Sequence, residues 1–308
     1  MVEVFGDAIR KNEWESLAQP LWRAEQIRSM ERRWAEQEGL PLYVLMERAG
    51  NALCNYACHH WPDSRQWWIF VGPGNNGGDG YVLARLARRI GLEPLVIAAR
   101  APCLLRGDAG RAAEEWLASG GSVTMAEDLL PATLPPPDLV IDALLGTGVQ
   151  LPLSSSMTKI VATINGLNAP VLAVDLPSGL NADTGRAMGA LVRATRTLTF
   201  IGIKQGMLTA DGVDGVGHLD RDPLGVTPGE ERVPAAERID YPSLKGLLTP
   251  RRRSAHKGHS GKVLLTGGTS ACRGPFCWRV RPACGRGRDW YACASTRIAR
   301  RPAWFNPS

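Results

Sequence analysis

The residues best suited to chemistry stand where apolar runs of the chain end. Asp142 lies in VIDALLGTGV, Asp175 and Ser178 lie in VLAVDLPSGL, and Lys204 lies in TFIGIKQGM. A carboxylate within a run of Val, Ile, Ala and Leu is costly to bury unless it is paired or binds a metal, so Asp142 needs a partner. These residues indicate a site that handles a charged or polar ligand.

A glycine-rich segment, GPGNNGGDG at residues 72–80, follows the first apolar run. Three of its glycines satisfy the G-x-G-x-x-G pattern of dinucleotide-binding loops. Two features depart from that pattern, because Asp79 would repel a phosphate at the helix that follows, and Arg100 stands where a ribose-binding acid is expected. Asn75, Asn76 and Asp79 instead supply amide and carboxylate oxygens, which suit a cation or a polar ring.

Each feature also has a simpler explanation. Asp79 fits the N-cap of a helix that begins at Gly80, residues 177–179 fit an ordinary turn, and Lys204 fits a solvated lysine at a sheet edge. Taken together, however, four buried runs each end in a polar residue beside glycine. Parallel sheets bind ligands at the carboxyl ends of their strands, so we favour a shared site there.

The elements that must position these residues alternate along the chain. Apolar runs typical of strands cover residues 66–72, 94–99, 122–126, 138–145, 170–175 and 195–201. Patterns typical of helices cover residues 22–38, 42–58, 80–90, 109–119 and 155–167. Strands that are apolar throughout are buried on both faces. The alternation therefore predicts an α/β fold with a doubly wound, mostly parallel sheet.

The composition narrows the class of protein. The chain has 308 residues, of which 44% are apolar and 21% charged, and this excludes disordered and collagen-like chains. No window approaches the roughly 18 apolar residues that a membrane-spanning helix needs, so we expect no membrane association. The first 20 residues carry charged side chains throughout and no apolar secretion segment, so we expect a cytoplasmic protein.

The net charge of +6 is unevenly distributed. Residues 251–308 hold 13 of the 36 Lys and Arg residues and one acidic residue, so the preceding body is net acidic. A net acidic body argues against nucleic acid as a partner.

The last 38 residues, 271–308, form a second anomaly. Arg, Ala, Cys, Gly, Pro and Trp fill 28 of these positions, and neither a helix nor a strand pattern fits them. All six residue types have GC-rich codons, so we interpret this irregular basic tail as translated out of frame. The alternative is a metal site built on its four cysteines, whose spacings match no paired C-x-x-C knuckle.

Four segments resemble a known family in order along the chain: GPGNNGGDGYVLARLA, VIDALLGTGV, AVDLPSGLNADTG and TFIGIKQGML. They are similar to the NAD(P)H-hydrate epimerase, the N-terminal domain of the bifunctional NAD(P)H-hydrate repair enzymes. The resemblance implies a Rossmann-like three-layer α-β-α sandwich over residues 1–228. It also implies interconversion of the R and S epimers of hydrated NADH or NADPH (NADHX, NADPHX), so that an S-specific dehydratase can restore the cofactor.

The resemblance further implies roles for individual residues. Asn76, Asp142 and Ser178 would hold a potassium ion, which prefers oxygen ligands of this kind. Asp175 is the candidate acid/base at the hydroxylated ring carbon, and Lys204 is a second candidate. Substrate contacts would fall on Asp175 and on two stretches, which are Asn75, Asn76, Gly77, Gly78 and Asp79, and then Gly146, Thr147, Gly148, Val149, Gln150, Leu151 and Pro152. Family members often form dimers, which leaves a homodimer open.

A shorter resemblance follows a proline-rich linker that we place at residues 229–250. Residues 251–270 look like the opening of the family's ribokinase-like, ADP- or ATP-dependent dehydratase domain, with KVLLT at 262–266 as a first strand. The downstream nucleotide loop and catalytic Asp of that domain have no counterpart before Ser308, so we expect no dehydratase activity. Two other functions stay open, namely a Rossmann-type NAD(P)-dependent oxidoreductase and a non-catalytic cofactor-binding module.

Overall fold

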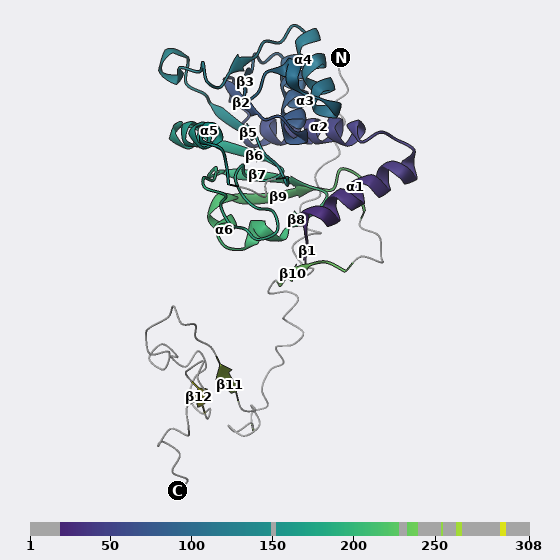
Figure 1. The fold of residues 1–308 in the computed structure, drawn as a ribbon, viewed down its shortest axis with the longest axis vertical. Coiled ribbons are helices and arrows are strands. Elements are labelled where there is room, and N and C mark those ends of the chain that lie inside the picture. The colour runs from purple at the N-terminus through teal and green to yellow at the C-terminus, as the bar shows by residue number, and fades with distance from the viewer. Residues whose placement is uncertain are drawn as a thin grey trace. The chain divides into compact units, whose positions relative to one another are not determined.

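The computed structural model describes residues 19–148, 152–227, 233–239, 254, 263–266 and 290–293. The chain divides into two compact units, residues 1–243 and 244–308. The larger unit contains the sheet and helices that the sequence predicts (Figure 1). None of the helices among these residues is both long and apolar enough to cross a membrane.

A seven-stranded sheet with all strands parallel forms the centre of the larger unit, in the order β4-β3-β2-β5-β6-β7-β9. Its strands are β2 (Trp67–Val71), β3 (Leu95–Ala98), β4 (Thr124–Met125), β5 (Leu139–Ala143), β6 (Val171–Val174), β7 (Arg196–Phe200) and β9 (His218–Asp222). The strand order reverses direction between β2 and β5, which is where doubly wound sheets open a crevice for ligands. The predicted α/β class is confirmed.

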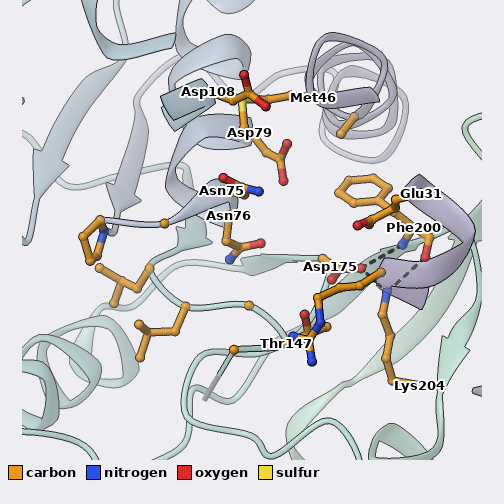
Figure 2. A pocket seen from close by; sticks show the side chains of 18 of the residues that line it. Glu31, Met46, Asn75, Asn76, Asp79, Asp108, Thr147, Asp175, Phe200 and Lys204 are labelled. Carbon is orange, nitrogen blue, oxygen red and sulfur yellow. Dashed lines mark hydrogen bonds and ion pairs between the residues drawn. The ribbon is translucent and has the colours of Figure 1, made fainter. Parts of the chain in front are cut away.

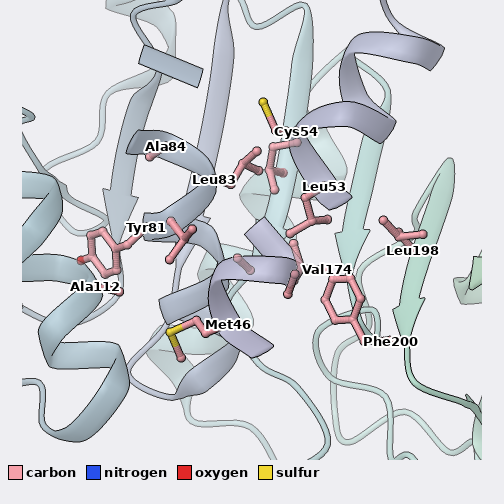
Figure 3. Packing of buried hydrophobic residues seen from close by; sticks show 14 of the residues in the cluster. Met46, Leu53, Cys54, Tyr81, Leu83, Ala84, Ala112, Val174, Leu198 and Phe200 are labelled. Carbon is pink, nitrogen blue, oxygen red and sulfur yellow. The ribbon is translucent and has the colours of Figure 1, made fainter. Parts of the chain in front are cut away.

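Helices cover both faces of this sheet. They are α1 (Ala24–Glu38), α2 (Tyr43–His60), α3 (Asn75–Arg89), α4 (Gly107–Ala118), α5 (Ser155–Gly166) and the short α6 (Gly212–Gly215), with 3-10 turns at Pro102–Leu104, Pro131–Thr133 and Gln205–Leu208. Alternate residues of β2 face opposite sides, since Ile69 packs with the core of α2, α3 and α4, whereas Phe70 packs with residues of α5. Figure 3 shows the first of these cores, where Leu53 of α2 and Leu83 of α3 meet over the sheet. The helices and the sheet therefore form the predicted three-layer α-β-α sandwich.

A second, small sheet was not predicted. Its strands are β1 (Gln19–Trp22), β8 (Ile203–Lys204) and β10 (Ala236–Arg238), with β1 antiparallel to β10 and parallel to β8. The prediction of a helix from Trp22 was wrong at its start, because the backbone of this residue belongs to β1 and the helix begins at Ala24. This sheet matters for the site because β8 carries Lys204.

The smaller unit contains two described strands, β11 (Val263–Thr266) and β12 (Trp290–Cys293), which pair in parallel. The first confirms the strand predicted at residues 262–266. The second lies within the tail that we expected to be irregular, so that expectation was wrong at these four residues, where aromatic side chains favour extended backbone. The other residues of that tail lie outside the described residues.

Candidate active site

A cavity of about 780 Å³ opens at the carboxyl ends of the central strands. Its walls come from the first turn of α3, the segments after β5 and β6, the end of β7, and the helices α1 and α2. Figure 2 shows side chains from these separate elements extending into one space. The cavity therefore lies on the rim that the sequence predicts for ligand binding.

The glycine-rich segment forms the first turn of α3, which begins at Asn75 after an extended N-cap at Gly74. The prediction that the helix starts at Gly80 was wrong, and with it the N-cap explanation for Asp79, which lies inside the helix. A Cβ at Gly77 would lie 2.0 Å from the carbonyl oxygen of Gly72, so only glycine lets the helix start this close to the strand.

This early start of α3 divides the predicted substrate residues into two groups. Asn75, Asn76 and Asp79 line the cavity, whereas Gly77 and Gly78 pack behind its lining. Burial raises the pKa of the Asp79 carboxyl well above its usual range, and the charges of Asp175 and Glu31 raise it further. Asp79 thus favours the protonated form and can donate a hydrogen bond to a ligand.

Asp142 and Ser178 contact each other, and both are fully buried, so neither of them lines the cavity. The Ser178 hydroxyl donates to Asp142 Oδ1 over 2.6 Å, and the Ser178 N–H donates to Oδ2 over 2.8 Å. Burial raises the pKa of Asp142 to about 6, although the hydrogen bonds from Ser178 and from the Leu144 N–H oppose this effect. No ion pair among the described residues includes Asp142, so its charge lacks a cationic partner.

Asn76, the third predicted cation ligand, lies in the first turn of α3. It is 8% exposed, and its Nδ2 has no hydrogen-bond partner among the described residues. Its side chain lies against Gly146, where a Cβ would come within 3.3 Å of Asn76 Cβ. The N–H of the neighbouring Leu145 donates to Ser178 Oγ over 2.9 Å. Asn76 and Ser178 therefore both flank the segment that follows β5.

The chemistry of these donors suits an alkali cation better than a transition metal. No group of three or more His, Cys, Asp or Glu side chains within the described ranges is arranged to hold a metal ion. Asp142, Ser178 and an amide that can rotate its oxygen inward offer hard oxygen donors, and they include an uncompensated carboxylate. Such donors are compatible with the predicted potassium ion, and its binding stays a prediction.

The predicted binding stretch 146–152 reaches the cavity where the structure describes it. Gly146, Thr147, Gly148 and Pro152 line the cavity. Val149, Gln150 and Leu151 lie outside the described residues, so their predicted contacts stay predictions.

Asp175 and Lys204 form an ion pair at the cavity wall. The Lys204 side chain is completely buried, and its ammonium also donates to Thr199 Oγ1 over 2.9 Å and to the Phe200 carbonyl over 3.0 Å. The alternative of a solvated edge lysine was therefore wrong. These three hydrogen bonds use all three N–H donors of the Lys204 ammonium, and its predicted catalytic role stays a prediction.

Asp175 is held with one oxygen anchored and the other open. Its Oδ1 accepts hydrogen bonds from Lys204, from the Phe200 N–H over 3.0 Å and from the Thr199 hydroxyl over 3.2 Å. No hydrogen bond from the described residues reaches Oδ2. The backbone of Asp175 has a φ of 62°, a left-handed conformation that is rare for residues other than glycine and often marks functional positions. Asp175 thus exposes one carboxylate oxygen, Oδ2, to the cavity.

Glu31 is one of three ionisable lining residues that the sequence reasoning missed, and the others are Arg28 and Asp108. It lies on α1 and faces the cavity alongside Asp79 and Asp175 (Figure 2). Burial raises its pKa to about 7, and the negative charge of Asp175 adds to the effect. The sequence around Glu31 did not indicate a functional role. The other candidates were identified because they lie at the ends of predicted strands, whereas α1 precedes the strands of the central sheet.

The chain is similar to known proteins. The family model "YjeF-related protein N-terminus" matches residues 42–206. The bifunctional NAD(P)H-hydrate repair enzyme Nnr of Escherichia coli K12 is 39% identical over 84% of this chain and 50% of its own length. An NAD(P)H-hydrate epimerase of Bordetella bronchiseptica is 38% identical over 67% of this chain and 88% of its own length.

A solved structure shares the fold. The crystal structure of yeast ynu0, YNL200c, superposes with a TM-score of 0.55 at 20% identity, and the match covers 72% of this chain and 96% of that chain. The chain spans about half the length of the bifunctional relatives it matches.

Proposed function

Because the chain belongs to the family of YjeF-related protein N-termini, we propose that it interconverts the R and S epimers of hydrated NADH and NADPH. The observation that carries this proposal is the position of Asp175 at the wall of the cavity. A buried lysine, Lys204, bonds its Oδ1, and its Oδ2 is open. The Bordetella relative supports the activity, because the match covers nearly all of a protein named for the epimerase alone.

The chemistry of the substrate explains why such a carboxylate is needed. Water adds to the enamine double bond of a dihydronicotinamide with its hydroxyl on the carbon next to the ring nitrogen. Inverting that carbon requires protons to be delivered and removed as the hydroxyl changes face. Asp175 is the acid/base that we assign to this step, and Lys204 positions it.

The neighbouring polar residues supply the binding surface. Asn75, Asn76 and Asp79 from α3, and Gly146, Thr147, Gly148 and Pro152 from the segment after β5, would contact the substrate. The cavity volume of about 780 Å³ lies in the range typical of cofactor-sized ligands.

We also propose that Asn76, Asp142 and Ser178 hold a potassium ion. A bound cation would neutralise the buried Asp142 carboxylate and stabilise the loops that carry Asn76 and Gly146. Two observations support this proposal: the fully buried Asp142 has no cationic partner among the described residues, and the buried amide of Asn76, whose Nδ2 makes no hydrogen bond there, is free to turn its oxygen toward a cation.

The S epimer would then pass to a dehydratase, as the names of the bifunctional relatives suggest. The prediction that this chain lacks dehydratase activity itself rests on residues 271–308, most of which lie outside the described residues, and it stays a prediction.

An epimer-ratio assay tests the function. Purified protein is incubated with R-NADHX in potassium chloride or in choline chloride, and the epimers are separated over time. We expect faster approach to equilibrium than in buffer, dependence on potassium, and loss of the acceleration in Asp175→Ala. Hydride turnover with intact NADH would favour an oxidoreductase, and an unchanged rate in Asp175→Ala would favour a non-catalytic role for this residue.

A further inference from the structure

The carboxyl of Glu31 is available to a ligand. It lies on α1, outside the family match at residues 42–206, and it lines the cavity. Within the described ranges it makes no hydrogen bond or ion pair. The two arginines nearest to it on the helix bond another residue, since Arg28 Nε lies 3.1 Å and Arg32 Nη2 lies 2.9 Å from the carboxylate of Glu25.

The groups around Glu31 favour a proton on its carboxyl. Burial is the main cause, and the negative charge of Asp175, at the end of β6, adds to it. Asp79, on α3, faces the same space but favours its protonated form. Lys204 from β8 and the two arginines of α1 oppose the protonation of Glu31, yet its pKa still rises to about 7. Near neutral pH a substantial fraction of Glu31 can therefore donate a proton.

If the hydroxyl departs and returns, inversion needs a proton donor in the first step and a proton acceptor in the second. Asp175 approaches from the end of β6 and Glu31 from α1, so the two carboxyls come from different elements and both line the cavity (Figure 2). Lys204 pairs with Asp175 and orients its carboxyl, which leaves Oδ2 open to accept a proton. Glu31, without such a partner, suits the opposite role.

We propose that Glu31 is the proton donor for departure of the substrate hydroxyl, and that Asp175 accepts the proton when water returns. This inference rests on the proposed epimerase function. The Glu31 proton passes to the hydroxyl, the carbon–oxygen bond breaks with its electron pair leaving on water, and the ring-nitrogen lone pair forms a carbon–nitrogen double bond. Water then adds to the other face, that double bond returns its electron pair to nitrogen, and Asp175 takes the proton of the added water.

The cycle closes without an oxidant or reductant. Glu31 has lost one proton and Asp175 has gained one, and exchange with solvent through the open cavity restores both. Because the acidic and basic roles are reversed in the opposite direction, the same pair serves conversion of either epimer.

The test compares Glu31→Gln, Glu31→Asp and the control Glu36→Gln, which changes an exposed glutamate on the same helix. The rate of R-NADHX epimerisation is measured against pH after the spontaneous rate is subtracted. We expect Glu31→Gln to lower kcat by about 100-fold or more with little change in KM. We also expect the wild-type rate to fall as pH rises through about 7, and this fall to vanish in Glu31→Gln. Glu31→Asp should recover part of the rate, and Glu36→Gln should behave as wild type.

Three results would overturn the inference. One is a kcat and a pH profile of Glu31→Gln that equal those of wild type. Another is that the fall in rate near pH 7 persists in Glu31→Gln but is lost in Asp79→Asn. The third comes from ¹⁸O-labelled water, because an enzymatically formed epimer that retains its original oxygen excludes departure of the hydroxyl. If wild-type protein does not accelerate epimerisation at all, it is the proposed function that fails, and this outcome is distinct from the other three.

Discussion

Replacing Glu31 by Gln should make the protein more stable at alkaline pH while making it a poorer enzyme. Burial and the Asp175 charge move the pKa of Glu31 from 4.5 to about 7, so ionising this carboxyl costs more in the folded protein than in the unfolded chain. A carboxyl with a raised pKa contributes stability below its unfolded pKa, and that contribution is lost as pH rises through the folded value. The amide side chain of the Glu31→Gln variant does not ionise, so the variant does not lose this stability as pH rises.

The magnitude follows from the two pKa values. At pH 8.5 both states are ionised, and the cost is at most about 3 kcal/mol, the equivalent of moving a pKa from 4.5 to 7. At pH 5 the folded wild type keeps its proton, and the difference from Glu31→Gln shrinks to less than about 1 kcal/mol. The advantage of the variant should therefore grow between pH 5 and pH 8.5.

Urea unfolding at fixed potassium concentration measures this difference. Wild type, Glu31→Gln and the exposed control Glu36→Gln are unfolded at several pH values, and their free energies of unfolding are compared. Equal stability of wild type and Glu31→Gln across the pH range would refute the claim that the folded protein disfavours the ionised form of Glu31. A stability loss in Glu31→Gln at every pH would show instead that its carboxylate has a structural partner.

Three further outcomes are expected. Potassium chloride should raise the unfolding free energy of wild type over choline chloride, by about 2.7 kcal/mol at a concentration 100 times the dissociation constant, and Asp142→Asn should lose this gain in thermal unfolding. Lys204→Met should destabilise the protein by about 3–5 kcal/mol in urea unfolding, because its buried ion-pair partner loses a counter-charge, and a loss below 1 kcal/mol would contradict the buried pair. Gly77→Ala should cost at least about 2 kcal/mol, whereas Gly166→Ala, which has open space around its Cβ position, should be nearly neutral in the same measurement.

The sequence predicted the central sheet well because its strands are apolar throughout. Runs such as WWIFV at β2 have no polar face, which is compatible only with burial on both sides. Each predicted strand of the larger unit was confirmed, with ends displaced by one or two residues. Polar residues directly after these runs could then be placed on one rim, and Asp175 and Asn76 do line the same cavity.

What could not be predicted depends on contacts between distant segments. The start of α3 was missed because Asn and Gly have low helix propensity, and only the close approach of Gly77 to Gly72 shows why glycines begin this helix. Lys204 was ambiguous because lysine is usually exposed, and its burial requires acceptors from both β7 and the end of β6. No local pattern reports such acceptors.

The small sheet explains how a helix outside the doubly wound core contributes to the site. β1 pairs with β8 so that Trp22 lies opposite Lys204, and α1 begins two residues after Trp22. One sheet thus fixes both the lysine that supports Asp175 and the start of the helix that carries Glu31. If both carboxyls take part in proton transfer, the separation between them is set by β1 and β8, and any change that loosens this pairing should lower the rate even though it touches neither carboxyl.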